Sequence, residues 1–182
     1  WYDSLGFKQL KREYVDNKMN GKSVQYFHNP LDSLVGIYKN NVKQNGYFKN
    51  YNTSVINSYD YFENKQTISK IYFYKNSTKK AIEIVYYINY DNASVSACLN
   101  LDRIDYYEND GSLIGSLEYK NVNVNPVDKG VLVNFHLDKQ NAYESVESII
   151  PYKKADRNGT AKYFDRKGKL IYKGIFKNGK EW

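Results

Sequence analysis

The feature that most constrains this chain is a stretch that occurs twice. YYENDGSLIGSLEYKNV, residues 106–122, returns as YFDRKGKLIYKGIFKNG, residues 163–179. Aligned without a gap, six of the seventeen positions are identical and three more are conservative. Each copy places a glycine-containing polar turn between two segments rich in aromatic and branched side chains. The chain is therefore expected to fold as a series of small repeated units that share a core.

The same pattern recurs more loosely toward the N-terminus. An aromatic pair is followed by a polar turn and by an apolar stretch that closes on an aromatic residue, lysine and asparagine. We count about six degenerate copies, with a spacing typical of repeat architectures. The pairs that open them are Tyr26–Phe27, Tyr47–Phe48, Phe73–Tyr74, Tyr106–Tyr107, Phe135–His136 and Tyr163–Phe164.

Each copy reads as a β-hairpin. Segments such as GVLVNFHLD and AIEIVYYINY alternate with period two and are rich in residues that favour strands, and no window sustains the helical period. Gly111 and Gly168 are expected at equivalent hairpin tips, where a positive φ is needed. Consecutive hairpins should pair with their neighbours. The sequence thus predicts one all-β domain over residues 1–182, an extended, twisted, antiparallel meander sheet of roughly 11 to 13 strands.

The positive charge does not mark a nucleic-acid-binding protein. The formal net charge is +7 and the pI is near 9.2, which would allow attraction to phosphates. The cations are nearly all lysines, spread through turns and interleaved with Asp and Glu. A solvated basic surface is the better interpretation, and no nucleic acid is expected as a partner.

Residues that bind metals or act as nucleophiles are scarce. His28 and His136 are the only histidines and Cys98 is the only cysteine, without the spacing of a zinc site. The setting of Cys98, SVSACLNL, indicates a buried thiol whose pKa would be raised and whose reactivity would be low. We therefore predict no metal, no cofactor and no catalytic residue.

Carboxylates crowd the segment LDRIDYYEND. Asp102, Asp105, Glu108 and Asp110 could suggest acid–base chemistry, since glycosidases need two carboxyl groups a few ångströms apart. Asp102 is next to Arg103, however, and Glu108 and Asp110 fall in an expected turn. A solvated structural role is favoured, and a carbohydrate-active site remains the alternative.

These patterns resemble a known family. The order N-G, an aromatic pair, a glycine turn and a closing aromatic-Lys-Asn-Gly is similar to bacterial MORN-repeat variants, often labelled antitoxin-like repeat proteins. Residues 158–179 fit best, then 106–121 and 20–41, whereas 47–100 has lost most of its glycines. The resemblance implies a single, twisted, extended antiparallel sheet and a role in protein interaction or membrane-surface association, with no catalytic residues to carry over.

Three features suggest export to a bacterial envelope. The chain starts at Trp1 rather than at methionine, which we take to indicate a removed N-terminal segment. Two DSL triplets, at Asp3 and Asp32, resemble the O-glycosylation acceptor of Bacteroidota envelope proteins, and the Lys/Asn/Tyr/Ile-rich composition suits such a bacterium. We expect a periplasmic or outer-membrane-associated protein, with a lipid anchor as one form; a cytoplasmic location is the alternative.

Three function classes follow from the sequence. The preferred one is a non-enzymatic protein-interaction or scaffold module, such as a subunit of an outer-membrane complex. The second is a glycan-binding or carbohydrate-active β-protein, because tyrosines and carboxylates are plentiful. The third is association with anionic lipid, which the net charge allows.

A binding surface can also be predicted. A sheet normally buries one face against a second layer, and this sequence offers no helices to supply it. Exposed apolar patches mark interaction sites, and Tyr is a frequent anchor. Unpaired strand edges are a second candidate surface. The rings expected on the partner-binding face are Tyr72, Tyr74, Tyr86, Tyr119 and Phe176.

Overall fold

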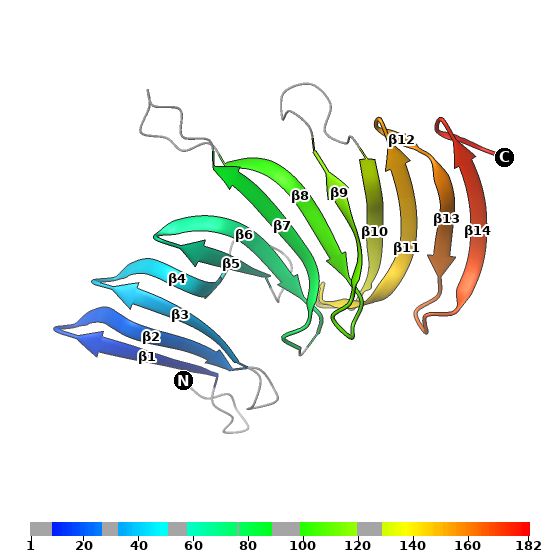
Figure 1. Cartoon of the computed structure of the whole chain (residues 1–182). Coiled ribbons are helices and arrows are strands. Elements are labelled where there is room, and N and C mark those ends of the chain that lie inside the picture. The colour runs from blue at the N-terminus through cyan, green and yellow to red at the C-terminus, as the bar shows by residue number, and fades with distance from the viewer. Residues whose placement is uncertain (1–8, 27–32, 51–57, 76, 89–98, 120–128) are drawn as a thin grey trace.

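A computed structural model shows the all-β meander predicted from the sequence. It describes residues 9–26, 33–50, 58–75, 77–88, 99–119 and 129–182, in which every regular element is a strand. The strands lie side by side in chain order (Figure 1). They are β1 (Leu10–Val15), β2 (Lys18–Tyr26), β3 (Ser33–Lys39), β4 (Val42–Lys49), β5 (Ser58–Glu63), β6 (Gln66–Phe73), β7 (Lys80–Ile88), β8 (Leu99–Tyr107), β9 (Leu113–Glu118), β10 (Lys129–Leu137), β11 (Tyr143–Lys153), β12 (Asp156–Arg157), β13 (Gly159–Phe164), β14 (Leu170–Lys177) and β15 (Lys180–Glu181).

All fifteen strands belong to one open antiparallel sheet. The count exceeds the predicted range partly because β12 and β15 have only two residues each. Both β12 and β13 pair with β11, and they are the two halves of a strand interrupted at Asn158. Within the described residues, the middle of the chain is as regular as the ends, because β4 to β7 pair in an unbroken series despite the lost glycines.

Two-residue turns connect the strands at one end of the sheet. Asn40 and Asn41, for example, have φ angles of 50° and 67°. Two successive positive φ values define the type I′ turn, which matches the twist of a hairpin and favours asparagine. Five such pairs join β1–β2, β3–β4, β5–β6, β11–β12 and β14–β15: Asp16–Asn17, Asn40–Asn41, Asn64–Lys65, Lys154–Ala155 and Asn178–Gly179.

A longer turn recurs at the other end, along the lower edge of Figure 1. In the segments 108–112, 138–142 and 165–169, the first residue's N–H binds the fifth residue's carbonyl, and the fourth residue's N–H binds the first residue's carbonyl. Gly111 and Gly168 are both fourth residues, with φ of 95° and 79°. The prediction of equivalent hairpin tips is confirmed, and Asn141 takes the same place at φ 58°.

The single sheet covers part of its own aromatic surface by curling. The tip between β6 and β7 reaches the start of β11, five strands away, where the Lys75 N–H donates to the Tyr143 carbonyl at 2.9 Å. The Lys75 ammonium also lies 2.9 Å from Asp138. Tyr74 is enclosed by this contact, and its hydroxyl donates to the Tyr107 carbonyl at 2.7 Å. The main core contains the buried residues Tyr74, Ala81, Tyr106, Leu117, Val133, Phe135 and Val146.

The ion pair at this contact predicts an acid-sensitive step in stability. The hydrogen bond from Lys75, together with the N–H groups of Ala142 and Gln140, lowers the pKa of Asp138 to about 2, against about 3.9 in an unfolded chain. A lowered pKa means that the carboxylate stabilises the fold above pH 4, and that this contribution is lost as the pH falls toward 2. We expect Asp138→Asn to lower the melting temperature at pH 7 and to have a much smaller effect at pH 2.

A matched control for this prediction is Asp165→Asn. Asp165 Oδ1 accepts the same two main-chain bonds in its turn, from Lys167 and Lys169, both at 2.9 Å. It does not touch Lys75, so the loss at pH 7 should be smaller. Equal losses for the two variants would show that the Lys75 contact contributes nothing beyond the turn itself.

Candidate binding surface

The five rings predicted to bind a partner differ in how much of each is exposed to solvent. Tyr74 is only 2% exposed and Phe176 only 8% exposed. The prediction that these two contribute to an exposed face is wrong, because the curl of the sheet encloses Tyr74, and Phe176 packs against Ile150 and Ala161. Tyr72, Tyr86 and Tyr119 are half-buried and keep part of each ring at the surface.

The three half-exposed tyrosines belong to one continuous group. Tyr72 pairs with Ile82, which pairs with Tyr106, so these side chains share a face across three strands. Tyr119 packs beside Tyr106 in the main core cluster. The Tyr143 ring lies 5.9 Å from the Tyr72 ring. Tyr106 is only 3% exposed and belongs to the core, so we call Tyr72, Tyr86, Tyr119 and Tyr143 the tyrosine row.

The hydroxyl groups of the tyrosine row influence one another. Burial raises the pKa of Tyr86, and the neighbouring Tyr72 and Asp60 raise it further. Burial likewise raises the pKa of Tyr143 to about 12, with a contribution from Tyr72. Burial also raises the pKa of Tyr119. Tyrosine has an ordinary pKa of about 10, so every hydroxyl of the row is protonated near neutral pH and is able to donate a hydrogen bond.

The rings at the centre of the row pack edge to face. Tyr72 and Tyr143 meet at 76°, and Tyr143 meets Phe135 at 77° with centroids 5.2 Å apart. Edge-to-face packing is a favourable arrangement for aromatic rings and covers a face of one ring in each pair. The row therefore contains rings that are packed against one another and still partly exposed.

The sequence pointed to three of these residues but missed Tyr143. Its segment, NAYESVESII, follows a turn that was not recognised, because Asn141 occupies the place where the other two turns have glycine. The aspartate that opens the turn, Asp138, could have revealed it. Its Oδ1 accepts the main-chain N–H groups of Gln140 and Ala142. Asp165 opens the last turn in the same way, with Lys167 and Lys169 as donors.

A pair of carboxylates faces the opposite side of the sheet. Glu83 and Asp105 are direct cross-strand partners. Ser69 donates to Glu83 at 2.9 Å and Lys80 at 2.7 Å. Arg103 and Ser116 donate to Asp105 at 2.9 Å and 2.5 Å. All four carboxylate oxygens are hydrogen bonded, which is the pattern of an ion network that ties β6 to β9 together.

The other residues considered for chemistry are dispersed. Asp102 forms an ion pair with Arg103 at 3.4 Å. Glu108 and Asp110 lie in the turn between β8 and β9, as predicted. His136 lies in β10 and donates from Nε2 to the Phe164 carbonyl at 3.0 Å. His28, Cys98, Asp3 and Asp32 lie outside the described residues.

Comparison with known proteins gives no match. No family model matches it, and neither does a curated protein or a solved structure. Among the described residues, three or more His, Cys, Asp or Glu side chains nowhere gather as a metal site would require. The same part of the chain contains no helix of the length and hydrophobicity that crossing a bilayer demands.

Proposed function

We propose that the protein is a non-enzymatic binding module that holds a protein partner on the tyrosine row. The observation that carries this proposal is that four half-buried tyrosines, from β6, β7, β11 and the position after β9, gather in one place with part of each ring at the surface. Tyr supplies large contact area at low cost in side-chain entropy, and it is a frequent anchor at interfaces. The partner that fits is an extended segment rich in hydrogen-bond acceptors.

Charge adds to the description of this partner. The formal net charge of the chain is +7, and such a charge raises the association rate of acidic proteins. Hydroxyl donors suit carboxylates and main-chain carbonyls equally. We therefore expect an acidic segment in an extended conformation.

A saccharide is the less favoured occupant of the tyrosine row. Flat ligands stack on exposed ring faces, as bases do on aromatic platforms. Tyr72 packs edge to face against Tyr143, and Tyr143 against Phe135, at 76° and 77°. This packing leaves less ring face free for stacking on a sugar ring, whereas the hydroxyls suit a chain with carbonyl groups.

The test removes hydroxyls and keeps the rings. A photo-crosslinking amino acid placed at residue 86 captures the partner in cells, and the same label at Tyr14, which is 57% exposed on β1, gives the background. The purified partner is then titrated with the triple variant Tyr72→Phe, Tyr86→Phe and Tyr119→Phe. Three lost hydrogen bonds of about 1 kcal/mol each correspond to roughly hundredfold weaker binding.

Two outcomes of this test are informative beyond the affinity. The control variant Tyr14→Phe with Tyr172→Phe removes exposed hydroxyls elsewhere and should bind as the parent does. If the triple variant binds the partner unchanged, the tyrosine row is not the site. If a glycan array gives signals that the triple variant loses while no protein is crosslinked at residue 86, the function is saccharide binding.

We place this module in the bacterial envelope as part of the same proposal. The support lies in the sequence, in the two DSL triplets and the resemblance to MORN-repeat variants. Fractionation of the source cells should recover the native chain with the envelope. Recovery from the cytosolic fraction would contradict the location and leave the binding proposal standing.

A further inference from the structure

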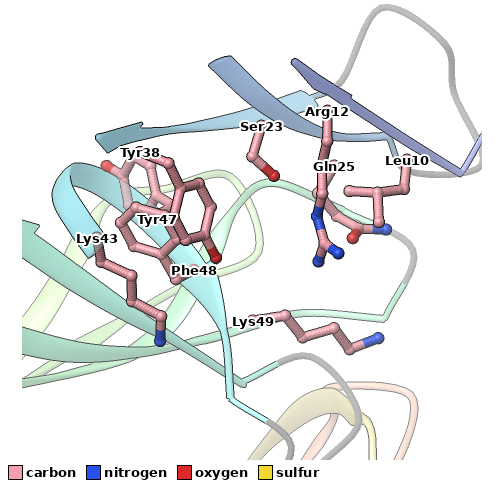
Figure 2. A pocket seen from close by; sticks show the side chains of 9 residues that line it. All are labelled: Leu10, Arg12, Ser23, Gln25, Tyr38, Lys43, Tyr47, Phe48 and Lys49. Carbon is pink, nitrogen blue, oxygen red and sulfur yellow. The ribbon is translucent and has the colours of Figure 1, made fainter. Parts of the chain in front are cut away.

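A small pocket lies on the N-terminal hairpins, apart from the tyrosine row. It has a volume of about 210 Å³, below the usual range for pockets that hold drug-sized ligands. Figure 2 shows the side chains of β1 and β2 extending toward those of β4, with aromatic rings beside them. The lining residues are Leu10, Arg12, Ser23, Gln25, Tyr38, Lys43, Tyr47, Phe48 and Lys49.

The strand register brings these side chains together. Arg12 is the direct partner of Ser23 across β1 and β2, and Ser23 is the partner of Gly36 in β3. Gly36 has no side chain to fill the space above it. A Cβ there would lie 2.6 Å from the Phe48 ring, so only glycine lets this ring lie across β3. The missing side chain is what lets Phe48 form one wall of the pocket.

The lining is strongly basic. It contains the cations of Arg12, Lys43 and Lys49 and no carboxylate. The acidic neighbours have other partners: Glu13 accepts the main-chain N–H of Lys22 at 2.8 Å, and Asp60 accepts from Asn50 at 3.0 Å. Arg12 and Lys43 have no carboxylate beside them in this lining, so an anion that enters the pocket is attracted to both.

Arg12 also has an unsatisfied group. Its Nε is buried and has no hydrogen-bond partner among the described residues. Buried polar groups are almost always hydrogen bonded, and an exception calls for an explanation. Guanidinium groups bind phosphate and related oxyanions through paired N–H groups. A ligand oxyanion that re-aims the guanidinium would satisfy this donor.

We propose that this pocket binds a tetrahedral oxyanion, a phosphate or sulfate group, carried by a small molecule. Arg12 is the main contact, Lys43 adds positive charge, and Ser23 supplies a hydroxyl. The rings give the pocket an apolar wall: Tyr38 and Phe48 pack edge to face at 4.9 Å. The Lys43 ammonium lies 5.2 Å from the Phe48 ring centre, which holds the cation at the pocket. This wall suits the body of a sugar phosphate or a similar compact ester.

The proposal is tested by calorimetric titration of the whole chain at low salt with inorganic sulfate, inorganic phosphate and glucose 6-phosphate, with glucose as the uncharged comparison. We expect saturable binding of the three anions and none of glucose. Arg12→Gln should weaken binding at least tenfold. Lys11→Gln is the matched control, because Lys11 is exposed one residue away and does not line the pocket.

Three results would overturn the proposal. The first is the absence of anion binding at low salt, where electrostatic attraction is strongest. The second is an equal loss for Lys11→Gln and Arg12→Gln, which would indicate a diffuse surface charge. The third is binding to vesicles of anionic phospholipid without binding of soluble phosphate esters. Circular dichroism of each variant confirms that a lost signal does not come from unfolding.

Discussion

Replacing Phe135 with alanine is expected to lower the free energy of unfolding by about 3 to 5 kcal/mol, the range for large aromatic residues removed from cores. Phe135 is 8% exposed and stands at the centre of the curled part of the sheet. Its ring lies 5.9 Å from that of Tyr74, 6.4 Å from that of Tyr106 and 5.2 Å from that of Tyr143. The cavity would thus separate rings from three different hairpins.

Chemical denaturation followed by circular dichroism measures this effect. Ile171→Ala is the control, because Ile171 is 64% exposed on β14 and its truncation should change the free energy of unfolding by less than about 0.5 kcal/mol. A loss below about 1 kcal/mol for Phe135→Ala would mean that the curl of the sheet is not what holds the fold together.

The turns show how far sequence reasoning reaches. Gly111 and Gly168 were assigned to equivalent tips because only a few residues accept a positive φ, and this local constraint is visible in the sequence. The matching Lys-Asn pairs at residues 39–40 and 177–178 mark the opposite end of the sheet, where Asn40 and Asn178 both have φ of 50°. Local backbone chemistry was therefore predictable at both ends.

The residues that the curl brings together could not be predicted, because they lie on strands that are distant in the sequence. Alternation along β6 gives the faces of Tyr72 and of its neighbours, but it does not show that Tyr74 meets Phe135 of β10. That contact follows from the summed twist and the bulges of the intervening strands, such as the one between Tyr106 and Tyr107. The sequence leaves two ways to cover the rings, the sheet's own curl or another protein, and the curl is what covers Tyr74.

The two candidate sites also differ in how far the sequence alone could predict them. Tyr72, Tyr86 and Tyr119 could be found from strand alternation, since each lies in an aromatic-rich segment. The pocket at Arg12 could not, because it depends on the pairing of β1 with β2 and on the Phe48 ring lying across Gly36. A missing side chain in one strand gives no sequence signal about a cation in another.

Two glycines with a positive φ, Gly130 and Gly168, differ in the space that a side chain would find around them. Gly130 has a φ of 131°, and a Cβ there would overlap the carbonyl oxygen of Ser116 in β9. Gly168 has a φ of 79°, and a Cβ there would meet nothing within 4 Å. The pair separates the cost of an unfavourable backbone angle from the cost of a steric clash.

Gly130→Ala is expected to destabilise the protein by about 2 to 5 kcal/mol, the sum of about 1 to 2 kcal/mol for the backbone angle and about 1 to 3 kcal/mol for overpacking. Gly168→Ala should lower the free energy of unfolding by only the contribution of the backbone angle, about 1 to 2 kcal/mol. The clash matters more than usual because, among the described residues, β9 and β10 are joined by two residue pairs, Lys129 with Glu118 and Gly130 with Leu117. Displacing Gly130 would therefore loosen the junction between the two halves of the sheet.

Hydrogen exchange should show faster exchange of the Leu117 and Val131 amides in Gly130→Ala and unchanged exchange there in Gly168→Ala. Equal free energies of unfolding for the two variants would mean that the β9–β10 junction widens without cost, and that the sheet does not depend on close approach at this glycine.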